Sequence, residues 1–180
     1  GEKFWDEVSK ETASSAAYLS LKTKASPWPS VPRFTICSGM KIKVYHLNKL
    51  IEPVSLPIKQ EKYAGCQIEL NLVEGENTSL QKYVVNLSTN DYSEQDLLPH
   101  CKTALNKLFA TSFEEILAEH SAAWATKWEQ NDIEIKGDLA AQQGIRFNIF
   151  HLQQTYTGED SRLNIGPKGF TGEKYGGVTY

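Results

Sequence analysis

The sequence predicts an α+β fold, in which part of an antiparallel β-sandwich precedes a set of helices. Two observations predict it. Up to about residue 88 apolar and polar residues alternate, as in strands that bury one face. After Asp91 the apolar residues recur every three or four positions, as on one face of a helix. With 180 residues, of which 40% are hydrophobic, the chain can bury one core or two small ones.

Alternation marks the strands. It runs through residues 18–24 (YLSLKTK), 41–47 (KIKVYHL) and 66–72 (CQIELNL). The turn-forming segment 73–77 (VEGEN) then leads into 78–88 (TSLQKYVVNLS), which is rich in β-branched and aromatic residues. We therefore expect 66–72 and 78–88 to pair as a hairpin, and the prolines to fall between strands.

Two helices are predicted next. Residues 93–110 carry a helical apolar stripe, with Pro99 in the first turn, where its missing N–H does little harm. Ser112 and Glu115 match the S-x-x-E capping box, which predicts a second helix that begins at Ser112 and runs through residues 113–130. The apolar face of this second helix should pack against something large.

The third predicted helix follows a short extended segment, residues 132–138 (DIEIKGD). Asp138 offers an N-cap carboxylate, and Gly158 suits the left-handed position after a helix. Apolar residues nearly encircle the stretch between them, so this helix should be buried. Because the chain supplies no further helices to surround it, we expect the chain to be part of a longer protein.

Composition argues against several classes of partner. The net charge of −3, with basic residues scattered along the chain, gives no general attraction to nucleic acid. The sequence has no apolar run of 18 residues, so we expect no membrane span and no signal peptide in the residues given. Cys37, Cys66 and Cys101 are odd in number and lack C-x-x-C spacing, which predicts buried thiols in a reducing compartment, the cytoplasm.

The last 19 residues, RLNIGPKGFTGEKYGGVTY, are rich in glycine. Gly166, Gly169 and Gly172 recur every three residues and follow a helix, so they match neither G-x-G-x-x-G nor G-x-x-x-x-G-K-[ST]. Phe170 and Tyr175 stand among the glycines. This mixture favours a tight loop that passes close to a ligand.

Residues 142–177 resemble the start of the catalytic domain of glycoside hydrolase family 65, and most closely its maltose phosphorylases. Residues 120–138 are similar to the helical linker of that family. The resemblance implies three parts: residues 1–90 are the C-terminal part of an N-terminal β-sandwich domain, 91–137 a helical linker, and 138–180 the first helix and loop of a truncated (α/α)6 barrel.

The resemblance also implies an activity. Members of the family convert an α-linked glucose disaccharide, here maltose first, and inorganic phosphate to β-glucose 1-phosphate and glucose with inversion. They need no metal or organic cofactor and form homodimers. In the family the glycine-rich loop leads into a Trp-Asp-Thr-Glu motif at the glucose subsite, and the sequence given stops directly before it. Tyr180 is therefore the candidate substrate-binding residue. No residue is a candidate catalyst, because the family's general acid lies further along the barrel, so the chain alone should be inactive.

Other polar residues have simpler interpretations. His120 is expected to be a structural histidine, and the acids of the loop region to be solvated charges or, for Glu173, a possible sugar contact. The acids of the loop region are Glu159, Asp160 and Glu173. Two lysines of the loop could present charge to phosphate, Lys168 and Lys174, although a structural or solvated role is the simpler interpretation. The alternative function is a stand-alone carbohydrate-binding or interaction module, in which Trp5 or Trp28 on an exposed sandwich face would bind sugar.

Overall fold

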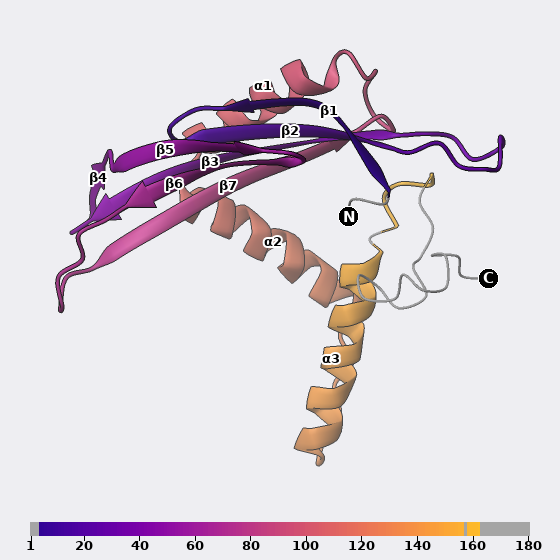
Figure 1. The fold of residues 1–180 in the computed structure, drawn as a ribbon. Helices are drawn as coiled ribbons and strands as arrows, with labels where there is room; N and C mark the ends of the chain where they lie inside the picture. The colour runs from indigo at the N-terminus through magenta and orange to yellow at the C-terminus, as the bar shows by residue number, and fades with distance from the viewer. Residues whose placement is uncertain (1–3, 157, 163–180) are drawn as a thin grey trace. The chain divides into compact units, whose positions relative to one another are not determined.

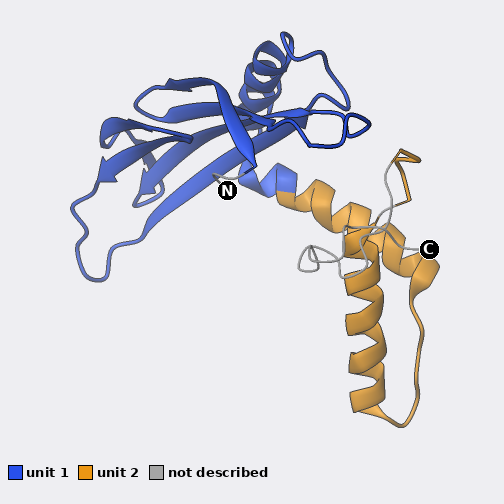
Figure 2. Ribbon diagram, turned by 45° about the vertical axis from the view of Figure 1, so that its right-hand side comes forward, with its two compact units in different colours: residues 1–116 blue, residues 117–180 orange. Residues whose placement is uncertain are grey.

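A computed structural model describes residues 4–156 and 158–162 (Figure 1). Antiparallel strands come first and helices follow, which confirms the predicted fold class. The described strands are β1 (Trp5–Thr12), β2 (Ala16–Thr23), β3 (Thr35–His46), β4 (Lys49–Ile51), β5 (Val54–Gln60), β6 (Tyr63–Glu69) and β7 (Thr78–Ser88). The described helices are α1 (Leu97–Ala110), α2 (Phe113–Asn131) and α3 (Leu139–Thr155). The chain divides within α2 into two compact units, residues 1–116 and 117–180 (Figure 2).

The main sheet of the first unit is built around β3. One edge of β3 pairs with β2 and then β4, and its other edge pairs with β7 along the whole run from Ile36↔Ser88 to His46↔Thr78. The predicted hairpin between 66–72 and 78–88 is therefore wrong. The long alternating strand β7 finds an equally long partner in β3, whereas β6 pairs with β5 through a two-residue turn in which Lys62 has a φ of 51°.

Helix α1 covers one face of the main sheet (Figure 1). Leu97, Cys101 and Leu105 recur every four residues and are buried, because this spacing places them on one side of the helix. They pack into a cluster with buried sheet residues: Ala16, Tyr18, Cys37 and Tyr83. Burial of Leu97 and Leu105 stabilises this layer by about 1.5 to 3 kcal/mol for each side chain.

The hairpin β5–β6 forms a separate two-stranded sheet against β1 and β2. Polar contacts fix it in place. Glu7 accepts hydrogen bonds from the Lys62 backbone at 2.6 Å and from the Lys10 ammonium at 2.9 Å, and Lys10 also donates to the carbonyl of Gln60. Pro57 lies inside β5 and not between strands, which an edge position in a two-stranded sheet allows.

The predicted start of α2 is confirmed. The Ser112 hydroxyl accepts a hydrogen bond from the Glu115 backbone N–H at 3.2 Å, and the Glu115 carboxylate accepts one from the Ser112 backbone N–H at 2.9 Å. This reciprocal pair is a capping box. It holds two backbone donors that the helix itself leaves without a partner.

In the second unit, α3 is tied to the segment that precedes it. Arg146 makes two hydrogen bonds to Asp132, at 2.9 and 2.6 Å, and the Gln142 amide bonds to backbone groups of Ile133 and Ile135. Asp138 accepts from the backbone N–H of the first turn, which confirms the predicted N-cap.

The C-terminal end of α3 differs from the prediction. The helix ends at Thr155, because Tyr156 has extended backbone angles, while Gly158 lies beyond it with a φ of 79°. None of the described residues of α3 is buried, and Leu139 and Phe147 are 86% and 62% exposed. The helix thus presents apolar side chains that the described part of its unit leaves uncovered.

Candidate functional site

Several candidates from the sequence lie outside the described residues. They are Tyr180, Lys168, Lys174 and Glu173, together with the rest of the glycine-rich loop from residue 163 onward. Tyr180 as a substrate-binding residue therefore stays a prediction.

The remaining polar candidates of the second unit are exposed or ion-paired. His120 lies on the exposed side of α2, with its ring 6.4 Å from that of Trp124. Glu159 pairs with Lys127 at 3.5 Å. Hydrogen bonds from Arg162, the shortest at 2.6 Å, lower the pKa of Asp160 to about 2. Asp160 therefore carries no proton at neutral pH and cannot serve there as a general acid.

The two tryptophans of the first unit have different surroundings. The Trp5 ring packs edge-to-face against Phe34, with ring centroids 5.5 Å apart. Trp28 lies in the loop between β2 and β3 and is 71% exposed. Of these two tryptophans, Trp28 has the largely solvent-exposed ring that a carbohydrate-binding module needs for stacking on a sugar.

The cysteines differ from one another as well. Cys37 on β3 and Cys101 on α1 are buried side by side between the main sheet and the helix. Cys66 on β6 is half-buried, so the prediction of a buried thiol is wrong there, because β6 belongs to the outer two-stranded sheet. The Cys101 thiol donates a hydrogen bond to Cys37, which lowers the pKa of Cys37 to about 7 and raises that of Cys101. Both are fully enclosed, which keeps them from serving as accessible nucleophiles.

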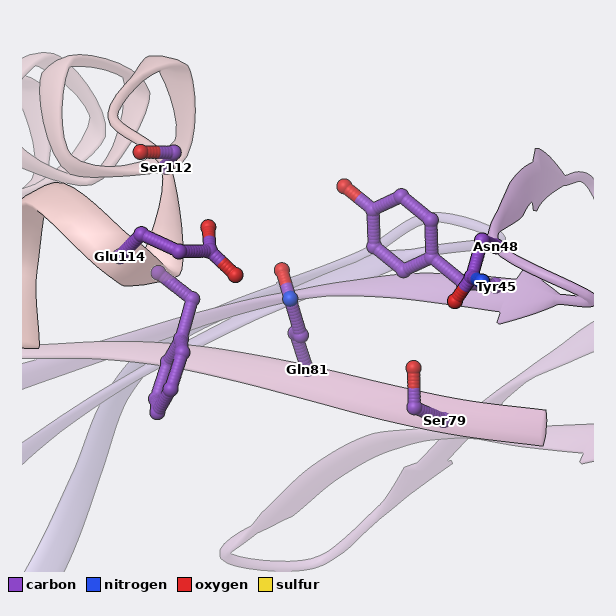
Figure 3. A pocket seen from close by; sticks show the side chains of 7 residues that line it. Tyr45, Asn48, Ser79, Gln81, Ser112 and Glu114 are labelled. Carbon is purple, nitrogen blue, oxygen red and sulfur yellow. The ribbon is translucent and has the colours of Figure 1, made fainter. Parts of the chain in front are cut away.

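A polar pocket of about 270 Å³ lies at one end of the main sheet (Figure 3). We call it the Gln81 pocket. Strands β3 and β7 form its floor, the turn after β3 forms one side, and the first turn of α2 forms the other. Its lining residues are Tyr45, Asn48, Ser79, Gln81, Ser112, Phe113 and Glu114.

The strand register explains why the floor of the Gln81 pocket is polar. Tyr45 lies opposite Ser79, and Lys43 lies opposite Gln81, so Tyr45, Ser79 and Gln81 point to the same side of the sheet. Figure 3 shows the Gln81 amide and the Glu114 carboxylate pointing toward each other above this floor. The sequence alone did not reveal this group, because it depends on pairing β3 with β7.

The chemistry that these lining residues offer is limited. Glu114 is the one carboxylate among them, so the pocket lacks the second carboxyl group that an inverting hydrolase uses to activate water. The lining also contains no lysine or arginine to hold a phosphate group. The side chains of this lining therefore suit a neutral polar ligand.

The chain matches two family models. Residues 1–127 match "Glycosyl hydrolase family 65, N-terminal domain", and residues 146–180 match "Glycosyl hydrolase family 65 central catalytic domain". The Gln81 pocket falls in the first match. No helix of the described residues is long and apolar enough to cross a membrane.

Several relatives of the chain carry the names of disaccharide phosphorylases. The chain is 38% identical over 179 residues to maltose phosphorylase of Bacillus subtilis strain 168, which is 99% of the chain and 22% of that protein. It is 36% identical to α,α-trehalose phosphorylase of Thermoanaerobacter brockii, over 61% of the chain and 14% of that protein. A solved human-microbiome protein assigned as a kojibiose phosphorylase superposes with a TM-score of 0.68 at 25% identity, over 97% of the chain and 21% of that structure. The chain thus spans about a fifth of the length of the relatives that it matches end to end.

Proposed function

The chain belongs to glycosyl hydrolase family 65, among relatives that are disaccharide phosphorylases, and we propose that it is the segment of such an enzyme that joins the N-terminal sandwich to the catalytic barrel. The observation that carries the proposal is the pair of consecutive matches, the first to the N-terminal domain and the second to the catalytic domain. The two matches also argue against a stand-alone binding module, because the second unit would then have no role.

Maltose is the proposed substrate. The supporting observation is that the similarity to maltose phosphorylase extends over 99% of the chain at 38% identity, whereas the match to trehalose phosphorylase covers 61%. The proposed reaction gives β-glucose 1-phosphate and glucose. Inorganic phosphate attacks the anomeric carbon on the face opposite the leaving sugar, while a carboxylic acid protonates the departing glycosidic oxygen.

Phosphate changes what the protein must supply. Water needs a base to become a nucleophile, but phosphate is already an anion, so the enzyme has to bind and orient it with hydrogen-bond donors and positive charge. We propose that the general acid and the phosphate site belong to the longer enzyme, that Tyr180 contacts the glucose subsite, and that the reaction uses no metal or organic cofactor. We further propose that the enzyme is a cytoplasmic homodimer, a location in keeping with the three free cysteines.

An assay of the longer enzyme tests the proposal. It is incubated with phosphate and, in separate reactions, with maltose, trehalose, kojibiose and nigerose, and the glucose 1-phosphate formed is measured and its anomer identified by NMR. We expect the β-anomer, with maltose as the preferred substrate, and no product from the 180-residue chain alone. Formation of the α-anomer, or turnover by the 180 residues alone, would contradict the proposal.

A further inference from the structure

We propose that the Gln81 pocket binds a single hexose unit, and that the first unit therefore carries a sugar site of its own, apart from the residues matched to the catalytic domain. This proposal goes beyond the phosphorylase reaction. It rests on the arrangement, the orientation and the charge of the side chains that line the pocket.

Gln81 is held in one orientation by a buried partner. The Tyr83 hydroxyl donates a hydrogen bond to Gln81 Oε1 at 2.8 Å, so Gln81 Nε2 is left to donate toward the pocket. Tyr83 itself is 6% exposed, and its ring packs edge-to-face on Phe109 with centroids 5.4 Å apart. A donor fixed in this way loses little side-chain entropy when a ligand binds.

The other polar side chains of the pocket are available to a ligand. Within residues 4–156 and 158–162, the Tyr45 and Ser79 hydroxyls and the Glu114 carboxylate make no side-chain hydrogen bond or ion pair. Ser112 is not available in the same way, because its hydroxyl already donates to Glu115 at 2.8 Å. The pocket thus offers the fixed amide donor of Gln81, a second amide on Asn48, one carboxylate acceptor and two hydroxyls that can either donate or accept.

This set of groups selects a class of ligand. The lining holds one carboxylate and no lysine or arginine, which disfavours anions such as phosphate, and a single carboxylate is too few for a divalent cation, which takes six or more oxygen ligands. A neutral polyol matches the mixture of donors and acceptors. The volume of about 270 Å³ is just below the range of about 300 to 1,000 Å³ that drug-sized ligands occupy, so one sugar ring fits better than two.

Aromatic rings complete the match to a hexose. Tyr45 and Phe113 both line the pocket, and a sugar ring has an apolar C–H face that packs on aromatic rings while its hydroxyls bond to amides and carboxylates. Phe113 is 49% exposed at the edge of the pocket, and a bound sugar would cover part of it.

The test is a titration of the 180-residue chain with D-glucose, followed by 15N–1H NMR. We expect shifts of the Gln81 side-chain amide and of the Ser79 and Glu114 backbone amides, with a Kd of about 1 mM, which corresponds to about 4 kcal/mol of binding free energy. Glu114→Gln keeps the shape of the side chain but removes its charge, and should weaken binding at least fivefold. Glu119→Gln makes the same change at an exposed residue of α2 that does not line the pocket, and should bind as the unchanged chain does.

The proposal would be overturned by the absence of any shift at the pocket residues with glucose at 50 times the expected Kd, by equal shifts with glycerol, or by unchanged affinity in Glu114→Gln. Inorganic phosphate serves as the negative probe, and shifts at the pocket with phosphate would also refute a neutral ligand. Matching amide spectra of the variants without sugar establish that each is folded. The titration involves no turnover, so its outcome is separate from that of the phosphorolysis assay.

Discussion

Replacing Gly39 with alanine should destabilise the first unit. A Cβ at this position of β3 would lie 2.8 Å from Cys101 Sγ and 2.8 Å from the nearest carbon of the Tyr18 ring, whereas ordinary van der Waals contacts are 3.4–4 Å. Cys101 is fully buried and Tyr18 is 9% exposed, so neither can swing into solvent. Overpacking of this kind costs about 1 to 3 kcal/mol, and with a urea m-value of about 2 kcal/mol/M the midpoint should fall by about 0.5 to 1.5 M.

Urea unfolding followed by far-UV circular dichroism measures the change. Gly144→Ala is the matched control, because nothing lies within 4 Å of a Cβ at this position of α3, and it should raise helix stability by about 0.5 to 1 kcal/mol. Adding Cys101→Ala to Gly39→Ala should recover part of the loss, with a coupling energy of about 0.5 kcal/mol or more. An alanine at position 39 that leaves the midpoint within 0.2 M of the original would refute the close packing of α1 on β3.

Three further predictions concern a cap, an ion pair and a thiol. Ser112→Ala should lower the free energy of unfolding by about 1 kcal/mol in the same urea assay, whereas Ser121→Ala, in the exposed middle of α2, should change it by less than about 0.5 kcal/mol. The hydrogen bonds from Arg146 lower the pKa of Asp132 below 3.8, so the Arg146–Asp132 ion pair should persist above pH 3.8 and be lost as the pH falls through the lowered pKa. Hydrogen exchange of the backbone amides of residues 132–135 should accelerate as the pair is lost. In Asp132→Asn, which cannot form the ion pair, exchange should be faster at every pH. In the folded chain one thiol of three, that of Cys66, should react rapidly with a disulfide reagent, and rapid reaction of all three would contradict the burial of the other two.

The sequence was sufficient to predict the features of the fold that depend on near neighbours. The capping box at Ser112 and the N-cap at Asp138 each need only residues three positions apart, and both were predicted correctly. The α1 stripe was found for the same reason, since Leu97, Cys101 and Leu105 share a face by helical spacing alone.

Strand pairing was harder to predict, because alternation shows which residues share a face but not which strand lies beside which. The segment 78–88 has the alternation of a strand whichever partner it takes, and the nearest candidate in sequence was the wrong one. The same limit hid the Gln81 pocket, since Tyr45 and Gln81 meet only through the β3–β7 register. Helix ends are similarly uncertain: glycine permits a left-handed turn at 158, but α3 already ends at Thr155.

The pairing of β3 with β7 has a consequence for synthesis on the ribosome. After β3 is complete at His46, about 60 more residues must be added before α1 is complete at Ala110, which takes on the order of 3 to 12 s at 5 to 20 residues per second. Until Ser88 is added the growing chain carries β3 without its long partner β7, and until Ala110 is added the cysteine-bearing face of the sheet lacks its cover. Holding chaperones should therefore bind most strongly to nascent chains of this length, because these expose an unpaired strand edge and an uncovered apolar face.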